Sequence, residues 1–147
     1  MLMTPEELKP LVETSLKFLK RAGLKVLDIR PRYVKLEMPL KNNENHIGIM
    51  YAGALFTISE VPGGALSYAT FDAEKFFPVV KDMSIRFIKP AKTDVTIEIS
   101  ISEEEAARIE KEATETGKSE FVLEGEIRDA SGEAVAAARG VYQLRKV

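Results

Sequence analysis

The segment from Ile47 to Phe71 is almost entirely apolar and carries a single formal charge, Glu60. A long run of small and apolar residues is typical of a helix that is buried on most of its sides. An unpaired carboxylate in such company costs several kcal/mol unless it is compensated or takes up a proton. Glu60 is therefore either a structural residue on a polar face of this helix or a general base or nucleophile held in a partly apolar cleft.

The composition is typical of one globular domain, and we predict a single domain over residues 1–147. The formal net charge is −2, and Lys and Arg form no basic stretch, so nucleic acid is not an expected partner. The absence of cysteine excludes disulfides, thiolate zinc sites and a cysteine nucleophile. We expect no metal and no cofactor.

The N-terminal segment does not resemble a signal peptide, because it is acidic and helical where a signal peptide is basic and then apolar. The apolar segment is a poor membrane span, since Glu60 and Pro62 interrupt it. We therefore predict a cytoplasmic protein with no membrane partner. A Ser-His-Asp triad is also not expected, because His46 is the only histidine and no Gly-x-Ser-x-Gly sequence is present.

The first half of the chain changes from helical to strand periodicity and back. The expected elements are a helix from Pro5 to about Gly23, strands at 26–30 and 33–38, a polar loop at 41–45, and the apolar helix from Tyr51 or Ala52. Thr4 is the predicted N-cap of the first helix. Pro62 lacks the N–H that would bond to the carbonyl of Ile58, so we expect a kink just past Glu60.

The second half is dominated by residues that alternate between apolar and polar, as in half-buried strands. The expected elements are strands at 82–87, 94–101, 121–127 and 134–144, a charged helical insert at 103–116, and a turn at 129–132. We predict that Met83, Ile85 and Phe87 face inward, and that all these strands belong to one antiparallel sheet.

This order of elements resembles the hot-dog fold, an α+β architecture in which an antiparallel sheet wraps a central helix. The segment Asn45–Glu60 is similar to the pattern of hot-dog acyl-CoA thioesterases, including phenylacetyl-CoA-thioesterase-like members. There, an Asn and a Gly precede a His-Gly-Gly at the helix start, and an Asp or Glu follows the second Gly by seven residues, a spacing that Gly53 and Glu60 keep. Residues 84–91 resemble the family's strand ending in Arg/Lys-Pro-Ala, and residues 129–133 resemble its last hairpin.

The resemblance implies hydrolysis of an acyl-CoA thioester, with Glu60 as base or nucleophile. The amides near Ala52 and Gly53, at the positive end of the helix, would receive the thioester oxygen, and Asn45 would orient water or substrate. Gly53 and Glu60 are about 10 Å apart along one helix, too far to act on one carbonyl. In the family, two central helices lie side by side, which implies a homodimer or a dimer of dimers with each site at the interface.

Two departures leave other functions open. Where the family has His-Gly-Gly, this chain has Tyr51-Ala52-Gly53, so a module that binds acyl-CoA without hydrolysing it is one alternative. His46 lies fourteen residues before Glu60, a spacing also found in hot-dog dehydratases, and an acyl-thioester hydratase or dehydratase is the other.

The remaining candidates concern substrate binding. In all three functions Tyr51 and Ala52 would contact the substrate, and Arg86 and Lys89, with Lys92, would meet the phosphates of coenzyme A through charge-assisted hydrogen bonds. Alternating charges on a strand are also common where a strand simply faces solvent.

Overall fold

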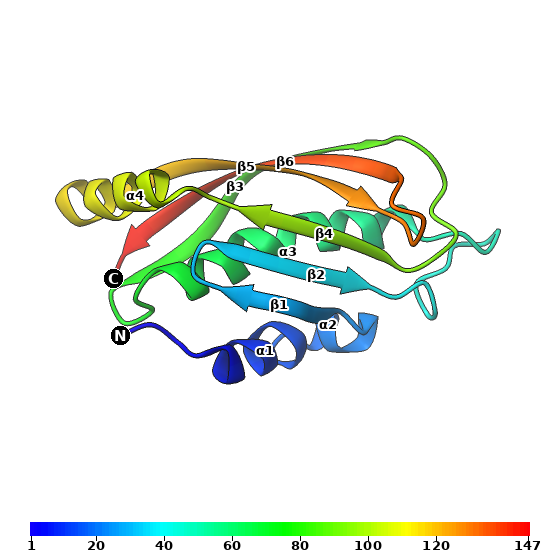
Figure 1. Cartoon of the computed structure of the whole chain (residues 1–147), viewed down its shortest axis with the longest axis horizontal. Helices are drawn as coiled ribbons and strands as arrows, with labels where there is room; N and C mark the ends of the chain where they lie inside the picture. The colour runs from blue at the N-terminus through cyan, green and yellow to red at the C-terminus, as the bar shows by residue number, and fades with distance from the viewer.

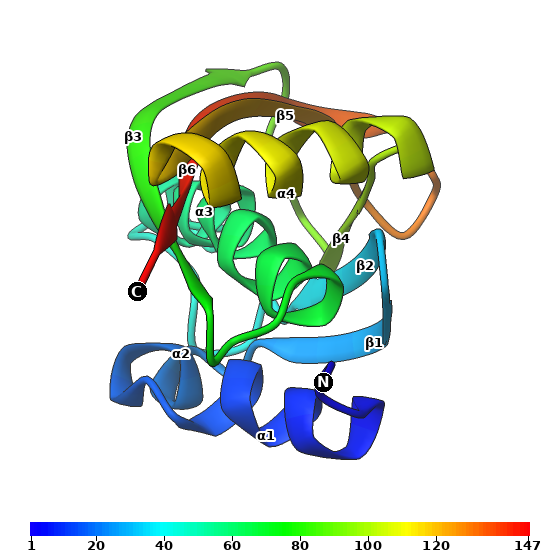
Figure 2. The same ribbon diagram turned by 90° about the vertical axis from the view of Figure 1, so that its left-hand side faces the viewer.

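A computed structural model, which describes residues 1–147, shows one antiparallel sheet curved around a single long helix, α3 (Ala52–Thr70). The sheet, seen in Figure 1, has six strands in the order β1-β2-β4-β5-β6-β3. Their bounds are β1 Lys25–Arg30, β2 Tyr33–Met38, β3 Phe76–Phe87, β4 Val95–Ser100, β5 Lys118–Arg128 and β6 Ala134–Lys146. Figure 2 looks along α3 and shows the sheet passing around it. The predicted α+β hot-dog architecture is confirmed.

The N-terminal helix is broken, and the prediction of one helix as far as Gly23 was wrong. The structure has α1 (Pro5–Thr14) and α2 (Lys17–Ala22), separated at Leu16, whose backbone is extended at φ −95° and ψ 116°. The hydroxyls of Thr14 and Ser15 donate back to the carbonyls of Pro10 and Leu11, a local pattern that bends or ends helices. Leu16 fits the apolar period of a single helix, but the break leaves its side chain 61% exposed.

The ends of the first helical region agree with the prediction. The hydroxyl of Thr4 accepts a hydrogen bond from the Glu7 N–H at 3.3 Å, as expected of an N-cap. At the other end, Gly23 adopts the left-handed conformation with φ 79°, and its N–H donates to the carbonyls of Leu19 and Lys20. Both α1 and α2 lie beneath α3 and β1 in Figure 2.

β3 is longer than predicted and forms one edge of the sheet. It pairs with β6 alone, so its outer edge leaves backbone N–H and C=O groups without strand partners. The side chain of Phe87, predicted to face inward, is 51% exposed, because no further strand or helix covers that end of β3. The predicted placement of β3 and β4 in one antiparallel sheet is confirmed, although they are not neighbours.

The charged insert forms α4 (Glu103–Thr116) as predicted, with Ser102 as N-cap and Gly117 in the left-handed conformation at its end. It packs on the end of β5 and β6 through the buried residues Ile109 and Ala113. Its other residues are mostly exposed, so α4 is a solvated structural helix away from α3.

Tyr142 of β6 holds α3 against the sheet. The ring of Tyr142 is buried and stacks on the ring of Phe121, with the ring centroids 5.7 Å apart. The Tyr142 hydroxyl donates a hydrogen bond to the backbone carbonyl of Glu60 at 3.1 Å. A Cβ on Gly63 would overlap this ring, so the helix approaches the strand closely only because residue 63 has no side chain. α3 stays helical through Pro62. None of the four helices has both the length and the apolar character needed to cross a membrane.

Candidate active site

Glu60 lies near the middle of α3, with its side chain half-buried. Burial raises the pKa of its carboxyl group above the usual glutamate value, and no cation or hydrogen-bond donor offsets this effect. A carboxylate that is desolvated but not paired accepts a proton more readily than an exposed one, which suits it to act as a general base. The backbone carbonyl of Glu60 accepts a hydrogen bond from the Tyr142 hydroxyl. This bond holds the backbone of Glu60 in place and so determines the position from which its side chain extends.

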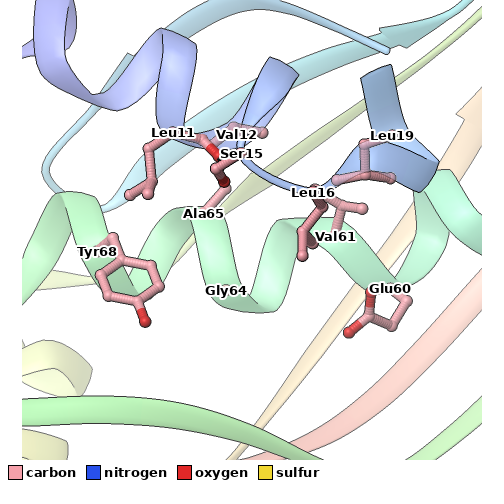
Figure 3. Close-up of a pocket in the computed structure, with 10 residues that line it drawn as sticks. All are labelled: Leu11, Val12, Ser15, Leu16, Leu19, Glu60, Val61, Gly64, Ala65 and Tyr68. Atoms are coloured by element: carbon pink, nitrogen blue, oxygen red, sulfur yellow. Dashed lines mark hydrogen bonds between the residues drawn. The ribbon is translucent and has the colours of Figure 1, made fainter. Parts of the chain in front are cut away.

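An apolar cavity of about 250 Å³ adjoins Glu60, between α3 and the two N-terminal helices. We call it the Glu60 pocket (Figure 3), and its lining residues are Leu11, Val12, Ser15, Leu16, Leu19, Glu60, Val61, Gly64, Ala65 and Tyr68. The break between α1 and α2 gives this pocket its roof, since Ser15 and Leu16 both line it. Glu60 is its only charged residue.

Glu60 also lines a second cavity, which lies between α2, α3 and β3. This α2–β3 seam has a volume of about 350 Å³, and its lining residues are Leu16, Lys17, Phe18, Leu19, Phe56, Thr57, Glu60, Val61 and Val80. Phe18, Phe56 and Val80 all have large exposed apolar side chains. An exposed apolar strip beside an unpaired strand edge is typical of a protein interface.

The first turn of α3 presents free backbone donors. The amides of Ala52 and Gly53 precede the first intrahelical bond, which runs from the Ala54 N–H to the Tyr51 carbonyl, and neither donates a hydrogen bond. They lie at the positive end of the helix dipole, where a developing negative charge is stabilised. The exposed ring of Tyr51 lies over Gly53, since a Cβ there would overlap it.

A groove of about 370 Å³ lies beside this turn, between the loop before α3 and the segment after β3. We call it the helix-start groove, and its lining residues are Asn45, Ile49, Met50, Ala52, Leu55, Phe87, Ile88, Lys89, Pro90 and Ala91. The sequence-predicted residues Asn45, Ala52 and Lys89 therefore come together here. Glu60 does not line this groove, so the two halves of the predicted chemistry are apart within one chain.

Two of the groove residues are already engaged in the structure. The side-chain oxygen of Asn45 accepts hydrogen bonds from the N–H groups of Ile47 at 3.0 Å and Ile49 at 3.3 Å, which fixes the loop. The Lys89 ammonium hydrogen-bonds Glu133, which raises the pKa of Lys89, and lies 3.5 Å from the Asp129 carboxylate.

Arg86 and His46 lie outside the cavities described above. The Arg86 side chain is exposed on β3 and lines neither the groove nor the Glu60 pocket. His46 is exposed in the loop before α3 and also lines neither. Nothing within one chain brings the imidazole of His46 to Glu60.

Three residues around Glu60 had no predicted role: Gly64, Tyr68 and Tyr142. The Gly63-Gly64 pair was a visible signal, because two glycines inside a helix cost stability unless something needs the space. The contact of Tyr142 with Glu60 could not be predicted, because the alternation along β6 indicates only that Tyr142 faces inward.

The fold and the chain's relatives place it in the hot-dog class, as the sequence predicted. The chain belongs to the family described as a domain of unknown function, DUF4442, which matches residues 6–143 and is thioesterase-like. No curated protein sequence matches the chain.

Solved structures agree with this assignment. The protein of unknown function PA5026 from Pseudomonas aeruginosa, described as a probable thioesterase, is 46% identical to this chain, with a TM-score of 0.95 and coverage of 100% of this chain and 99% of that one. The thioesterase HI1161 from Haemophilus influenzae is 14% identical, with a TM-score of 0.77 over 99% and 93% of the two chains. A mutant of the thioesterase enzyme SAV0944 from Staphylococcus aureus is 20% identical, with a TM-score of 0.73 over 88% and 99%. The last two show the fold alone.

Proposed function

We propose that this protein hydrolyses acyl-CoA thioesters to a free acid and coenzyme A, at a site that a second copy of the chain completes. The observation that carries the proposal is Glu60. It is the only charge in the apolar segment 47–71, burial raises its pKa without any ion pair, and it adjoins an apolar pocket. Buried carboxylates without partners are costly, and functional sites are where proteins retain them.

In this proposal Glu60 acts as general base. Its carboxylate takes a proton from a water molecule while the water oxygen attacks the thioester carbonyl carbon. The resulting oxyanion accepts hydrogen bonds from the free amides at the α3 start of the second copy. When the C–S bond breaks, Glu60 returns the proton to the departing thiolate, so the products are the acid and the thiol of coenzyme A.

The second copy is needed for two independent reasons. Within one chain the Glu60 carboxylate and the Gly53 amide are seven residues apart on one helix, about 10 Å along its axis. In addition, the α2–β3 seam exposes the apolar side chains of Phe56 and Val80, and Val80 belongs to β3, which is an edge strand. Pairing two β3 edges would join two sheets and bring the second α3 beside Glu60. We propose a homodimer, which can pair further into a tetramer.

A charged residue in the seam tests this arrangement. In the Val80→Lys variant, dimerisation would bury an unpaired ammonium, which costs about 3 kcal/mol or more and weakens association about 100-fold. Sedimentation should show wild type at twice 16.4 kDa or more and the variant largely at the chain mass of 16.4 kDa. Turnover should fall with the dimer fraction.

Val122→Lys is the matched control for this experiment. Val122 is 40% exposed on β5 and Val80 is 45% exposed on β3, so both changes place a lysine on the sheet at similar exposure. The control should keep the mass and the activity of wild type. A fully active 16.4 kDa monomer of the Val80→Lys variant would contradict a shared site.

The direct test of the function is release of free thiol from a panel of short, medium, long and aromatic acyl-CoAs. Wild-type protein that binds one of these but releases no thiol from any would instead be a non-catalytic acyl-CoA-binding module. The ring of Tyr51 is the observation that favours this second candidate, because it lies against Gly53, one of the two residues whose amides are proposed to bind the oxyanion. Whether the protein hydrolyses or only binds acyl-CoA, Arg86, Lys89 and Lys92 are the proposed contacts for the phosphates of coenzyme A. Lys89 is paired with Glu133 and would have to exchange that carboxylate for a phosphate.

A further inference from the structure

The Glu60 pocket has polar groups at its two ends and an apolar interior. Glu60 and Tyr68 lie at opposite ends of the pocket in Figure 3, eight residues apart on α3, or about 12 Å along its axis. Between them the floor is Val61, Gly64 and Ala65 of α3. The roof comes from α1 and α2, and the hydroxyl of Ser15 in that roof is already bonded to the Leu11 carbonyl.

The position of Glu60 leaves two directions for an acyl group. If the proposed function holds, the thioester carbonyl lies about 3 Å from a water bound to Glu60. From there the acyl group can enter the Glu60 pocket or the α2–β3 seam, since Glu60 lines only these two of the cavities described. The seam is the surface that the second copy would cover. The helix-start groove, with Asn45 and Lys89 in its wall, suits the polar coenzyme A portion.

We infer that the Glu60 pocket receives the acyl group and restricts it to an uncharged hydrocarbon of about six to ten carbons, straight or carrying one aromatic ring; this rests on the proposed function. The estimate comes from volume: an apolar cavity of about 150 Å³ holds benzene, and this one has about 250 Å³. A charged or heavily hydroxylated acyl group is excluded, because the apolar lining would leave its polar atoms without partners.

Gly64 is the residue that keeps the pocket open. No atom lies within 4 Å of a Cβ built on Gly64, and its backbone is helical with no positive φ. A Cβ at this position therefore meets open space, and because Gly64 lines the pocket, a longer side chain there would take up part of its volume. It would also raise the helix propensity of α3, so we expect the variant to melt no lower than wild type, and a thermal melt checks that a loss of activity does not come from unfolding.

The test is the dependence of kcat/KM on acyl length in wild type and Gly64→Leu. For the variant we expect kcat/KM with octanoyl-CoA to fall at least tenfold relative to acetyl-CoA or butyryl-CoA. Leu11→Ala, which enlarges the roof at a half-buried position, should shift the optimum toward longer chains. Ala107→Leu, on the exposed face of α4, adds the same side chain elsewhere and should leave the profile unchanged.

Binding of S-octyl-CoA, a thioether that cannot be hydrolysed, separates this inference from the proposed function. Calorimetry should show at least tenfold weaker binding to Gly64→Leu than to wild type. If no thiol is released from any acyl-CoA but this difference appears, hydrolysis is refuted and the pocket assignment stands. If hydrolysis occurs with the same length profile in both proteins, the pocket assignment is overturned and the function stands. Absence of both effects overturns both.

Discussion

Glu60→Gln is expected to lower thioester hydrolysis by about 100-fold or more, because glutamine keeps the size and hydrogen-bonding capacity of the residue but cannot take a proton from water. Binding of S-octyl-CoA should change little, since the carboxylate is not proposed to hold the coenzyme A portion. The measurement is thiol release per folded protein, with wild type as the reference. A rate within a few-fold of wild type would end the assignment of Glu60 as the base.

The same substitution should raise stability at neutral pH. Burial raises the folded-state pKa of Glu60 above its usual value of 4.5, so between these two values the folded protein binds more protons than the unfolded chain. The contribution of Glu60 to stability is then most favourable below pH 4.5 and declines as the pH rises through its folded-state pKa. A neutral glutamine side chain carries no such penalty, so the variant should melt higher than wild type at pH 8 and equally at low pH.

The pH dependence of the rate gives a further check on Glu60. A base must be ionised, so kcat/KM should fall on the acid side with an apparent pKa above 4.5. The acid limb should disappear in the residual rate of Glu60→Gln. If Glu60 were only structural, Glu60→Gln would change the melting temperature but leave the fall of kcat/KM at acid pH in place. The rate, the melting temperature and the pH profile together therefore distinguish a catalytic Glu60 from a structural one.

The sequence was most informative where one residue or a strict period determines the structure. The long apolar run predicted the helix α3, its lone charge made Glu60 a candidate site residue, and the alternation at 94–101 predicted β4. The break at Leu16 was missed because Leu16 fits the helical spacing of apolar residues. The hydrogen bond from the Ser15 hydroxyl to the backbone, which helps to end α1, cannot be recognised from the spacing of apolar residues. β3 was predicted too short because an edge strand loses the inside–outside alternation that identifies a strand.

The site was harder to predict, since its cavities are bounded by segments far apart in the sequence. The Glu60 pocket needs Leu11 and Gly64, and the helix-start groove needs Asn45 and Lys89. Neither spacing forms a motif. What the sequence did contain was the Gly63-Gly64 pair, and in the structure these adjacent glycines have different surroundings: Gly63 lies against the ring of Tyr142, and Gly64 borders the Glu60 pocket.

Gly63→Ala is expected to destabilise the protein by about 3 kcal/mol or more. A methyl group at this position would overlap the ring of Tyr142, which is buried and stacked on Phe121 and therefore cannot rotate away. The helix would have to move off β6, and the hydrogen bond from the Tyr142 hydroxyl to the Glu60 carbonyl would be lost. In a chain of this size the melting temperature should fall by about 10 °C.

Gly64→Ala is the matched control, one residue further along the same helix, and should have the opposite sign. Its methyl group meets no atom within 4 Å, so only the gain in helix propensity remains, up to about 1 kcal/mol or roughly 3 °C in melting temperature. If both variants were destabilised equally, helix α3 would not tolerate alanine for some reason unrelated to Tyr142. The pair of melts therefore tests the packing of α3 on β6, which fixes the backbone position from which Glu60 reaches its pocket.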